Sequence, residues 1–255
     1  FFRDPQDTVS SLLWSSAEGR ADTFGRLNDV TEKLWRIDNG RVISEVAAAV
    51  RDVPAFIADG HHRYTTALNY ATSLRDSGQI DENHEANFVM FCLVAREDPG
   101  LLVLPTHRIL GGLSEDFTVE RLVRQVDAFE WQRCSVADID LRNAGELLRR
   151  YGSGAMAFIG AHPAEIWVGK LARPELMDEL APEEPEAWRK LDVAILHKVV
   201  IDRALGPWWT DDVWVDYTPD GQSVLAACQS ARAQLGICLQ PTALAAVEEI
   251  SLAGG

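Results

Sequence analysis

The sequence predicts an α/β protein, of the α+β kind with a mixed sheet, in two regions. Short apolar runs typical of strands alternate irregularly with longer amphipathic segments typical of helices. The character of the chain changes after Gly111-Gly112, and 255 residues are enough for two modest domains that each have a core. We therefore expect a first region at residues 1–112 and a second α/β subdomain at residues 113–255.

In the first region, turn residues separate the predicted elements. Asn39-Gly40 precedes an amphipathic helix, Asp59-Gly60 turns a strand into a helix, and residues 97–100 (Glu-Asp-Pro-Gly) join two apolar runs that predict a buried hairpin. The elements in chain order are a strand at 34–37, a helix at 42–50, a strand at 56–58, a helix to about residue 75, and hairpin runs at 87–95 and 101–104.

The second region alternates helical and strand-like patterns. His162-Pro163-Ala164 joins two strands, and the acidic segment 182–185 leads into a long helix. The predicted helices are 119–129, 141–151, 188–205, 223–233 and 242–252, and the predicted strands are 155–160, 165–171, 213–217 and 237–239.

The charge balance narrows the class of partner. Asp and Glu number 39 against 24 Lys and Arg, which gives a net charge of −15. This excess repels phosphate backbones, and no run of basic residues offsets it. We therefore expect no nucleic-acid partner, whereas one local site for a small anion remains compatible with the charge.

Cysteine usage and hydropathy indicate a cytoplasmic protein. The four cysteines are scattered without a C-x-x-C pair, which argues against a disulfide framework or a zinc knuckle. The longest apolar stretch, residues 88–95, is too short to span a bilayer, and no secretory signal is visible at the start. We expect a reducing cytoplasm and no membrane association; the oligomeric state is not predicted.

Residues 56–68 predict an anion site where a strand passes through a loop into a helix. The N-terminus of a helix carries free backbone N–H groups and a partial positive charge. Gly60 allows a sharp turn and a close approach of the ligand, and Asp59 is expected to cap the helix. Arg63 adds a planar fork that matches phosphate oxygens. This clustering predicts a phosphate site, although each residue alone is compatible with a structural role.

The helical repeat divides the residues of this helix between two faces. Tyr64, Ala67, Leu68, Ala71 and Leu74 share one face, which we expect to be buried. His62 lies opposite, while His61 and Arg63 lie at the edges of the buried face.

Other histidines and acids give weaker signals. His107-Arg108 follows an apolar run and is a candidate second phosphate contact, with a solvated surface pair as the alternative. Asp192 and His197 are about 140° apart on a regular α-helix, so a joint metal site is not expected from them. Asp192 is open to a salt bridge or a magnesium site, and no H-E-x-x-H or comparable pattern predicts a transition metal among the histidines.

The segment Ile57-Ala58-Asp59-Gly60-His61-His62-Arg63-Tyr64 resembles the signature of an uncharacterised bacterial protein family grouped with ParB-like proteins. Residues 98–101 (Asp-Pro-Gly-Leu), 104–108 (Leu-Pro-Thr-His-Arg) and 191–197 (Leu-Asp-Val-Ala-Ile-Leu-His) resemble further landmarks of that family. The resemblance covers nearly the whole chain. It implies that family members carry a further N-terminal portion and a lysine-containing segment after the final helix.

More distantly, the segment is similar to the phosphate-binding turn of the ParB/sulfiredoxin superfamily, which includes ParB CTPases, sulfiredoxin and free-serine kinases. The resemblance implies a ParB/sulfiredoxin-like core in residues 1–112, with Gly60, His62 and Arg63 against phosphate. His61 stands where sulfiredoxin has its reactive cysteine, so sulfinic-acid reduction is not expected.

The resemblance implies a nucleotide-dependent phosphotransferase, or an NTP hydrolase, that acts on a small hydroxyl-bearing metabolite such as serine. Its cofactor would be ATP, ADP or another nucleotide with Mg²⁺. The expected catalytic residues are Asp59, His61 and His62, with Asp59 as the base or a magnesium ligand. The expected phosphate or nucleotide contacts are Gly60, His62, Arg63, His107 and Arg108. A ParB-like nucleotide switch without metabolite turnover and a non-catalytic scaffold are the alternatives.

Overall fold

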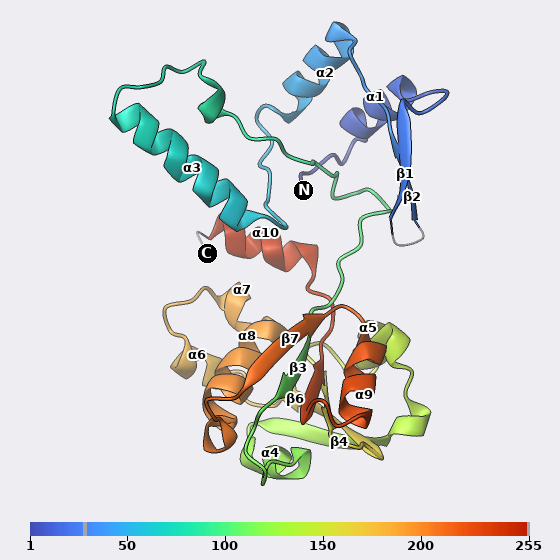
Figure 1. Cartoon of the computed structure of the whole chain (residues 1–255), viewed down its shortest axis with the longest axis vertical. Coiled ribbons are helices and arrows are strands. Elements are labelled where there is room, and N and C mark those ends of the chain that lie inside the picture. Colours follow the sequence, from blue (N-terminus) through green and yellow to red (C-terminus); the bar gives the residue numbers. More distant parts are fainter. Residues whose placement is uncertain (28–29, 254–255) are drawn as a thin grey trace. The chain divides into compact units, whose positions relative to one another are not determined.

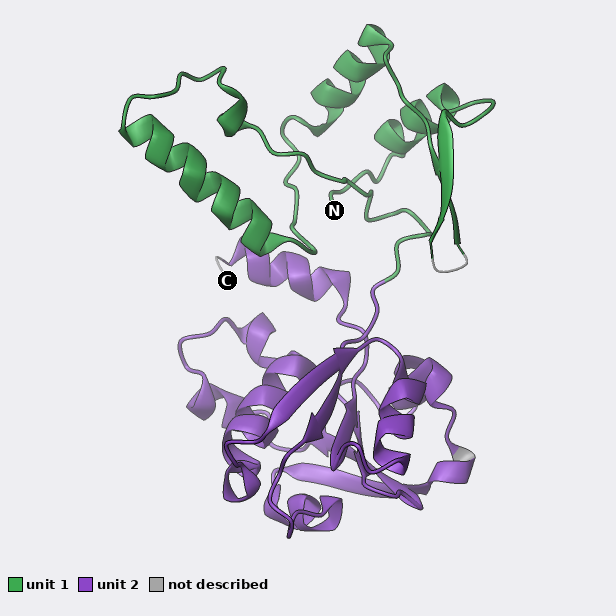
Figure 2. Ribbon diagram, viewed as in Figure 1, with its two compact units in different colours: residues 1–102 green, residues 103–255 purple. Residues whose placement is uncertain are grey.

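The computed structural model describes residues 1–27 and 30–253, which form two compact units at Phe1–Leu102 and Val103–Gly255 (Figure 2). The sequence predicts a boundary after Gly112 instead. The strand β3 (His107–Gly111) accounts for the difference, because it pairs with two strands of the second unit and therefore belongs to that unit.

Unit 1 consists of three helices, a small hairpin and long connecting segments. The carboxylate of Asp4 accepts hydrogen bonds from the backbone N–H groups of Thr8, Val9 and Ser10 at 2.8–3.0 Å and so caps the first helix. The elements are α1 (Thr8–Ser16), the antiparallel strands β1 (Thr23–Leu27) and β2 (Val30–Leu34), α2 (Gly40–Val50), α3 (His61–Asp76) and a 3₁₀ turn at Glu85–Asn87.

The helix predictions for unit 1 are confirmed by α2 and α3, but several strand predictions are wrong. β2 ends at Leu34, where a strand at 34–37 is predicted. Segments 56–58, 87–95 and 101–104 are fully described and lie outside the strands, so the expected hairpin is absent from them. Phe2 forms isolated bridges with Ala55, beside the first segment, and with Ala95, at the end of the second. An apolar run becomes a strand only where another strand pairs with it, and these runs meet no such partner. The buried cluster of this unit is accordingly small and contains Phe2, Val9 and Ala95.

In the described residues, unit 2 is built on a six-stranded sheet of order β4-β6-β5-β8-β3-β7. Its neighbouring strands are all antiparallel, so the expected mixed sheet is an antiparallel one. Besides β3, the strands are β4 (Phe129–Ser135), β5 (Met156–Gly160), β6 (Glu165–Leu171), β7 (Trp214–Thr218) and β8 (Leu235–Cys238). The four strands predicted for residues 113–255 correspond to β5, β6, β7 and β8, whereas β3 and β4 are not predicted.

Helices cover both faces of this sheet (Figure 1). One face, which includes Leu110 and Phe158, packs under α4 (Val119–Gln125), α6 (Leu176–Leu180), α8 (Asp192–Ile195) and the π-helix η4 (Leu196–Ala204). The other face, which includes Ile109 and Ile159, packs under α5 (Ala144–Arg149) and α9 (Gly221–Gln229). The remaining helices are α7 (Glu186–Arg189) and α10 (Leu244–Leu252), with short 3₁₀ turns at Val136–Asp138, Leu141–Asn143 and Gly206–Trp208.

Several of the predicted helices are wrong in extent: α9 ends at Gln229 instead of residue 233, and α5 covers only Ala144–Arg149 of the segment 141–151. The segment 188–205 is divided among α7, α8 and η4, because Leu191 takes an extended conformation (φ −70°, ψ 132°) that interrupts the helix. The segment 119–129 is helical only to Gln125, and Phe129 begins β4, where its ring packs against Trp131 and Phe158. In the described part of the chain, no helix combines the length and the apolar character needed to cross a bilayer.

Candidate functional site

The turn into α3 has the backbone shape that the sequence predicts for an anion site. Gly60 is the N-cap residue and takes the left-handed conformation (φ 88°, ψ 23°), which only glycine adopts readily. Among the residues that the structure describes, no side chain caps the N–H groups of the first turn. The expected capping by Asp59 is therefore wrong, because the Asp59 carboxylate accepts instead from Arg63 Nη2 at 2.9 Å.

The Arg63 side chain folds back over Gly60. A Cβ atom on Gly60 would lie 2.9 Å from Arg63 Nη2, so glycine is also the residue that leaves room for the guanidinium. Both members of the ion pair are largely exposed, at 80% for Arg63 and 91% for Asp59. An exposed pair of this kind contributes little to stability, so its main effect is to hold the guanidinium at the start of the helix.

The two neighbouring histidines are also on the surface. The rings of His61 and His62 are exposed, with centroids 6.2 Å apart, and both project from the first turn of α3. The predicted buried face of this helix is present in reduced form: Ala71 is buried, Tyr64 packs its ring against Phe91, and Leu68 remains 45% exposed. Unit 1 thus presents Asp59, Gly60, His61, His62 and Arg63 together on one exposed turn.

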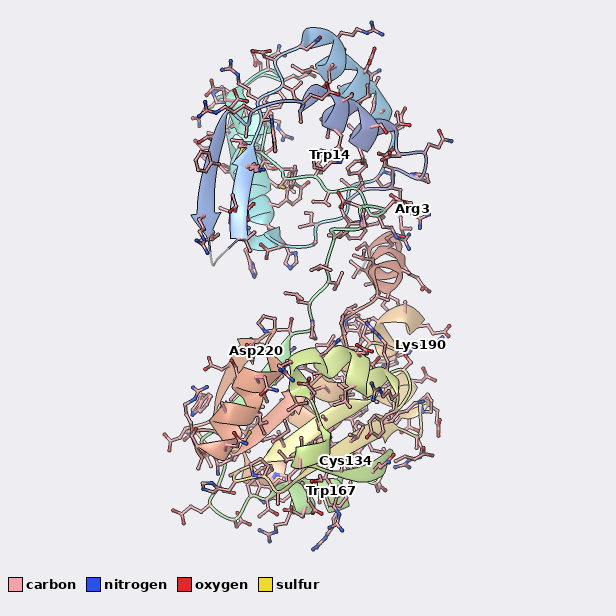
Figure 3. The ribbon with its side chains drawn as sticks, turned by 90° about the vertical axis from the view of Figure 1, so that its right-hand side faces the viewer. Arg3, Trp14, Cys134, Trp167, Lys190 and Asp220 are labelled. Atoms are coloured by element: carbon pink, nitrogen blue, oxygen red, sulfur yellow. The ribbon has the colours of Figure 1, made fainter. Side chains whose placement is uncertain are left out.

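His107 and Arg108 lie in unit 2 and are buried, so they are not the solvated surface pair considered as the alternative. As neighbours on β3 they point to opposite faces of the sheet. His107 Nδ1 accepts the backbone N–H of Leu239 at 3.1 Å. Burial lowers the pKa of His107 to about 4, an effect that the charge of Arg108 reinforces and the carboxylate of Asp220 opposes. Asp220, labelled in Figure 3, is the N-cap residue of α9 (Gly221–Gln229).

Arg108 projects towards the face that η4 covers. Its Nη1 donates to the carbonyl of Thr106, its Nη2 lies 3.5 Å from His197 Nε2, and its guanidinium carbon lies 4.6 Å from the ring centroid of Tyr217. Burial lowers the pKa of Arg108. His197 and Tyr217 are the neighbours that the sequence does not reveal, because they lie far from Arg108 in the chain.

The helix residues near this arginine also show the effects of burial. Burial lowers the pKa of His197, with a further lowering by Arg108 and an opposing contribution from Asp202. Burial raises the pKa of Asp192, although backbone hydrogen bonds from its own N–H and from Gln240 partly offset this. Within the described residues, no group of three or more His, Cys, Asp or Glu side chains is placed to hold a metal ion.

A cavity of about 580 Å³ lies elsewhere in unit 2, with Lys170, Arg189 and Ile195 among its lining residues. None of the residues predicted for the site lines it. The predicted residues thus form two groups, the exposed turn Asp59–Arg63 in unit 1 and the buried His107 and Arg108 in unit 2.

Comparisons with known proteins identify a family. A comparison with curated proteins gave no match. A solved structure of a conserved hypothetical protein from Pyrococcus furiosus is similar at 14% sequence identity and a TM-score of 0.37, over 98% of this chain and 77% of that one. The model of the DUF1015 family, described as a protein of unknown function, matches residues 1–194. The chain therefore belongs to the DUF1015 family.

Proposed function

We propose that this chain is a nucleotide-dependent phosphotransferase that acts on a small hydroxyl-bearing metabolite such as serine. The observation that carries the proposal is the turn at Gly60, where an uncapped helix N-terminus and the Arg63 guanidinium lie together on the surface. Uncapped backbone N–H groups and a guanidinium are the donors that phosphate oxygens accept from.

Each residue of the turn has a role in this proposal. The backbone N–H groups after Gly60 hold the phosphates of ATP, ADP or another nucleotide, and Arg63 and His62 offset the charge that develops on the transferred group. The hydroxyl oxygen of the acceptor attacks the terminal phosphorus of the nucleotide. The bond between that phosphorus and its bridging oxygen breaks, and the shortened nucleotide leaves with that oxygen. Asp59 takes the proton of the acceptor hydroxyl. His61, on the same first turn, is the further catalytic residue of the proposal. A water in place of the acceptor would make the reaction NTP hydrolysis.

The donor set at the turn is compatible with Mg²⁺ only if the nucleotide supplies further oxygens. Asp59 is the one carboxylate among residues 59–63, and its Oδ2 contacts Arg63. Magnesium is usually held by one or two carboxylates together with phosphate oxygens and water. If Asp59 were the magnesium ligand instead of the base, bound Mg²⁺ would offset charge on the phosphates.

Sequence resemblance gives separate support. The turn is similar to the phosphate-binding turn of the ParB/sulfiredoxin superfamily, and a ParB/sulfiredoxin-like core in unit 1 is part of this proposal. Among those proteins, the free-serine kinases have the chemistry that suits a turn carrying a carboxylate, an arginine and no thiol.

The test is nucleotide binding by wild type and two matched variants. Calorimetric titration with ATP, ADP and CTP, each with Mg²⁺, should detect binding, and Arg63→Ala should weaken it by about tenfold or more. Arg41→Ala is the control, because Arg41 is an exposed arginine of the same unit and also pairs four residues away, with Glu45 at 2.7 Å. Neither variant should change the melting temperature of the free protein much.

Phosphorus NMR with candidate acceptors then separates the possible outcomes. A new phosphate-ester signal with serine or another alcohol supports the kinase, and free phosphate alone supports hydrolysis. Nucleotide binding without turnover would leave a switch. The absence of binding for every nucleotide would refute the proposal.

A switch or interaction protein is a second candidate because unit 1 exposes large apolar side chains. Phe88 is 70% exposed and Met90 is 96% exposed, in a segment that also contains the exposed Phe91 and Leu93. Clustered exposed apolar side chains often mark surfaces for protein partners. A change in oligomeric state on nucleotide addition, measured by light scattering, would favour the switch.

A further inference from the structure

Unit 2 contains a buried positive charge without a negative partner. The Arg108 residue is only 5% exposed. Its contacts are a carbonyl, an imidazole and a phenol ring, and none of these groups is a carboxylate. Within the described residues, Arg108 Nε has no hydrogen-bond partner, and no carboxylate forms an ion pair with this guanidinium.

Such an arrangement is costly for a folded protein. A guanidinium has five N–H donors and stays charged in proteins, so burial does not remove its charge. A buried charge without a partner costs several kcal/mol in order of magnitude, and buried polar groups without a partner are few in folded proteins. Where such a group does occur, a bound ion or water often satisfies it.

His197 adds a second nitrogen on the same side. Because burial and Arg108 both lower its pKa, the ring is neutral at neutral pH, and its Nε2 faces the guanidinium. The ring projects from η4, which keeps π-helical geometry over nine residues. Helices of this type are rare and often occur at functional sites.

We propose that Arg108 and His197 form an oxyanion-binding site in unit 2, which takes a carboxylate or phosphate group of a small ligand. The planar guanidinium of an arginine can donate to two oxygens of such a group. In Arg108, the Nε–H group has no partner among the described residues and is therefore the donor that would bind the oxyanion. The site borders solvent, because Thr106 and Tyr217 are exposed and His197 is half-buried. This inference does not depend on nucleotide binding at Gly60, since both groups belong to unit 2.

The experiment uses inorganic phosphate and acetate as separate probes of the full chain, each compared with chloride at equal ionic strength. At ten times its Kd, a bound probe should raise the melting temperature by about 3–6 °C. In ¹⁵N NMR, the Nε–H signal of Arg108 is identified as the one that is missing from the spectrum of Arg108→Lys. The chemical shift of this signal should change when the probe is added to wild type. The probe that acts identifies phosphate or carboxylate as the bound group.

Two variants separate binding from a structural role. Arg108→Met should lose the response to the probe and, in chloride, should be at least as stable as wild type, because it replaces a buried unpaired charge by an apolar chain. Arg133→Met is the matched control: Arg133 also lies near an aromatic ring, at 5.8 Å from that of Trp167, but it is exposed and paired with Glu165. This control should respond as wild type does.

Other variants complete the test. His197→Gln should weaken binding of the probe by about tenfold. In the NMR titration, Arg63→Ala should leave the movement of the Arg108 Nε–H signal unchanged, which separates this site from any phosphate binding at the turn after Gly60.

Two results would overturn the inference: no response of wild type to either probe, or an equal response in Arg108→Met. If Arg108→Met does not fold, the NMR titration of wild type decides alone, because an unmoved Arg108 signal refutes the site.

Discussion

Acid should destabilise unit 2 through His107. The ring is 1% exposed, and burial lowers its pKa from 6.5 to about 4. The unfolded chain therefore binds a proton between pH 6.5 and pH 4 that the folded chain does not bind. Stability from this group is present above pH 6.5 and decreases as the pH falls towards 4, which is the direction for a histidine buried in its neutral form.

The size of the effect follows from the two pKa values. Linkage gives a loss of about 2.5 kcal/mol between about pH 7 and pH 4.5 for this histidine alone. His107→Asn should remove that part of the pH dependence, because asparagine does not titrate and its carbonyl oxygen can still accept the Leu239 N–H. The variant should lose some stability at neutral pH through the smaller side chain, but its stability should decrease less on acidification.

Urea unfolding followed by tryptophan fluorescence at the two pH values measures this difference. Aspartates whose hydrogen bonds lower their pKa, such as Asp140, also lose stabilisation in acid, but they do so in both wild type and His107→Asn. His162→Asn is the control, because His162 is exposed, belongs to the same unit and has a left-handed φ of 49° that asparagine tolerates. Equal acid sensitivity of His107→Asn and wild type would refute the buried neutral histidine.

Other predictions concern the turn, the thiols and the core. Gly60→Ala should cost about 1 kcal/mol from its positive φ, displace the arginine that lies over it and abolish nucleotide binding, which calorimetry and urea unfolding would measure. Cys92 is exposed and should react with a thiol reagent in the folded protein. Cys228, whose pKa burial raises to about 12, and the buried Cys238 should react only after unfolding, and mass spectrometry would reveal early labelling that contradicts this. Phe158→Ala removes a fully buried ring and should cost about 3–5 kcal/mol in urea unfolding; a cost below about 1 kcal/mol would contradict the described core.

The sequence predicts best where local pattern decides the structure. β5 and β6 are correctly predicted because a turn joins two apolar runs that pair with each other. Segment 56–58 is also apolar but meets no partner strand, and pairing is a property of the whole fold. The helix predicted at 188–205 is wrong for a different reason. Its prediction assumes the 3.6-residue repeat of an α-helix, which does not apply to the π-helix η4.

The candidate sites show the same division. Gly60 and Arg63 meet within one helical turn, so their spacing alone predicts that they lie together. Arg108 and His197 are 89 positions apart, and no short-range pattern predicts their contact. Adjacent positions can also give a wrong prediction. His107 and Arg108 are predicted to act together, but adjacent residues of a strand point to opposite faces of the sheet.

The position of β3 in the sheet has a consequence for synthesis. β3 is the first strand of unit 2 to leave the ribosome, yet both of its neighbours, β7 and β8, come from the last part of the chain. His107 acquires its backbone partner 132 positions later. Until those residues are translated, the strand that carries Arg108 has two unpaired edges, and contacts so distant in sequence form slowly. Chains that stop before residue 235 should therefore aggregate or be degraded, because β8, the strand that joins β3 to β5, is then missing from the centre of the sheet.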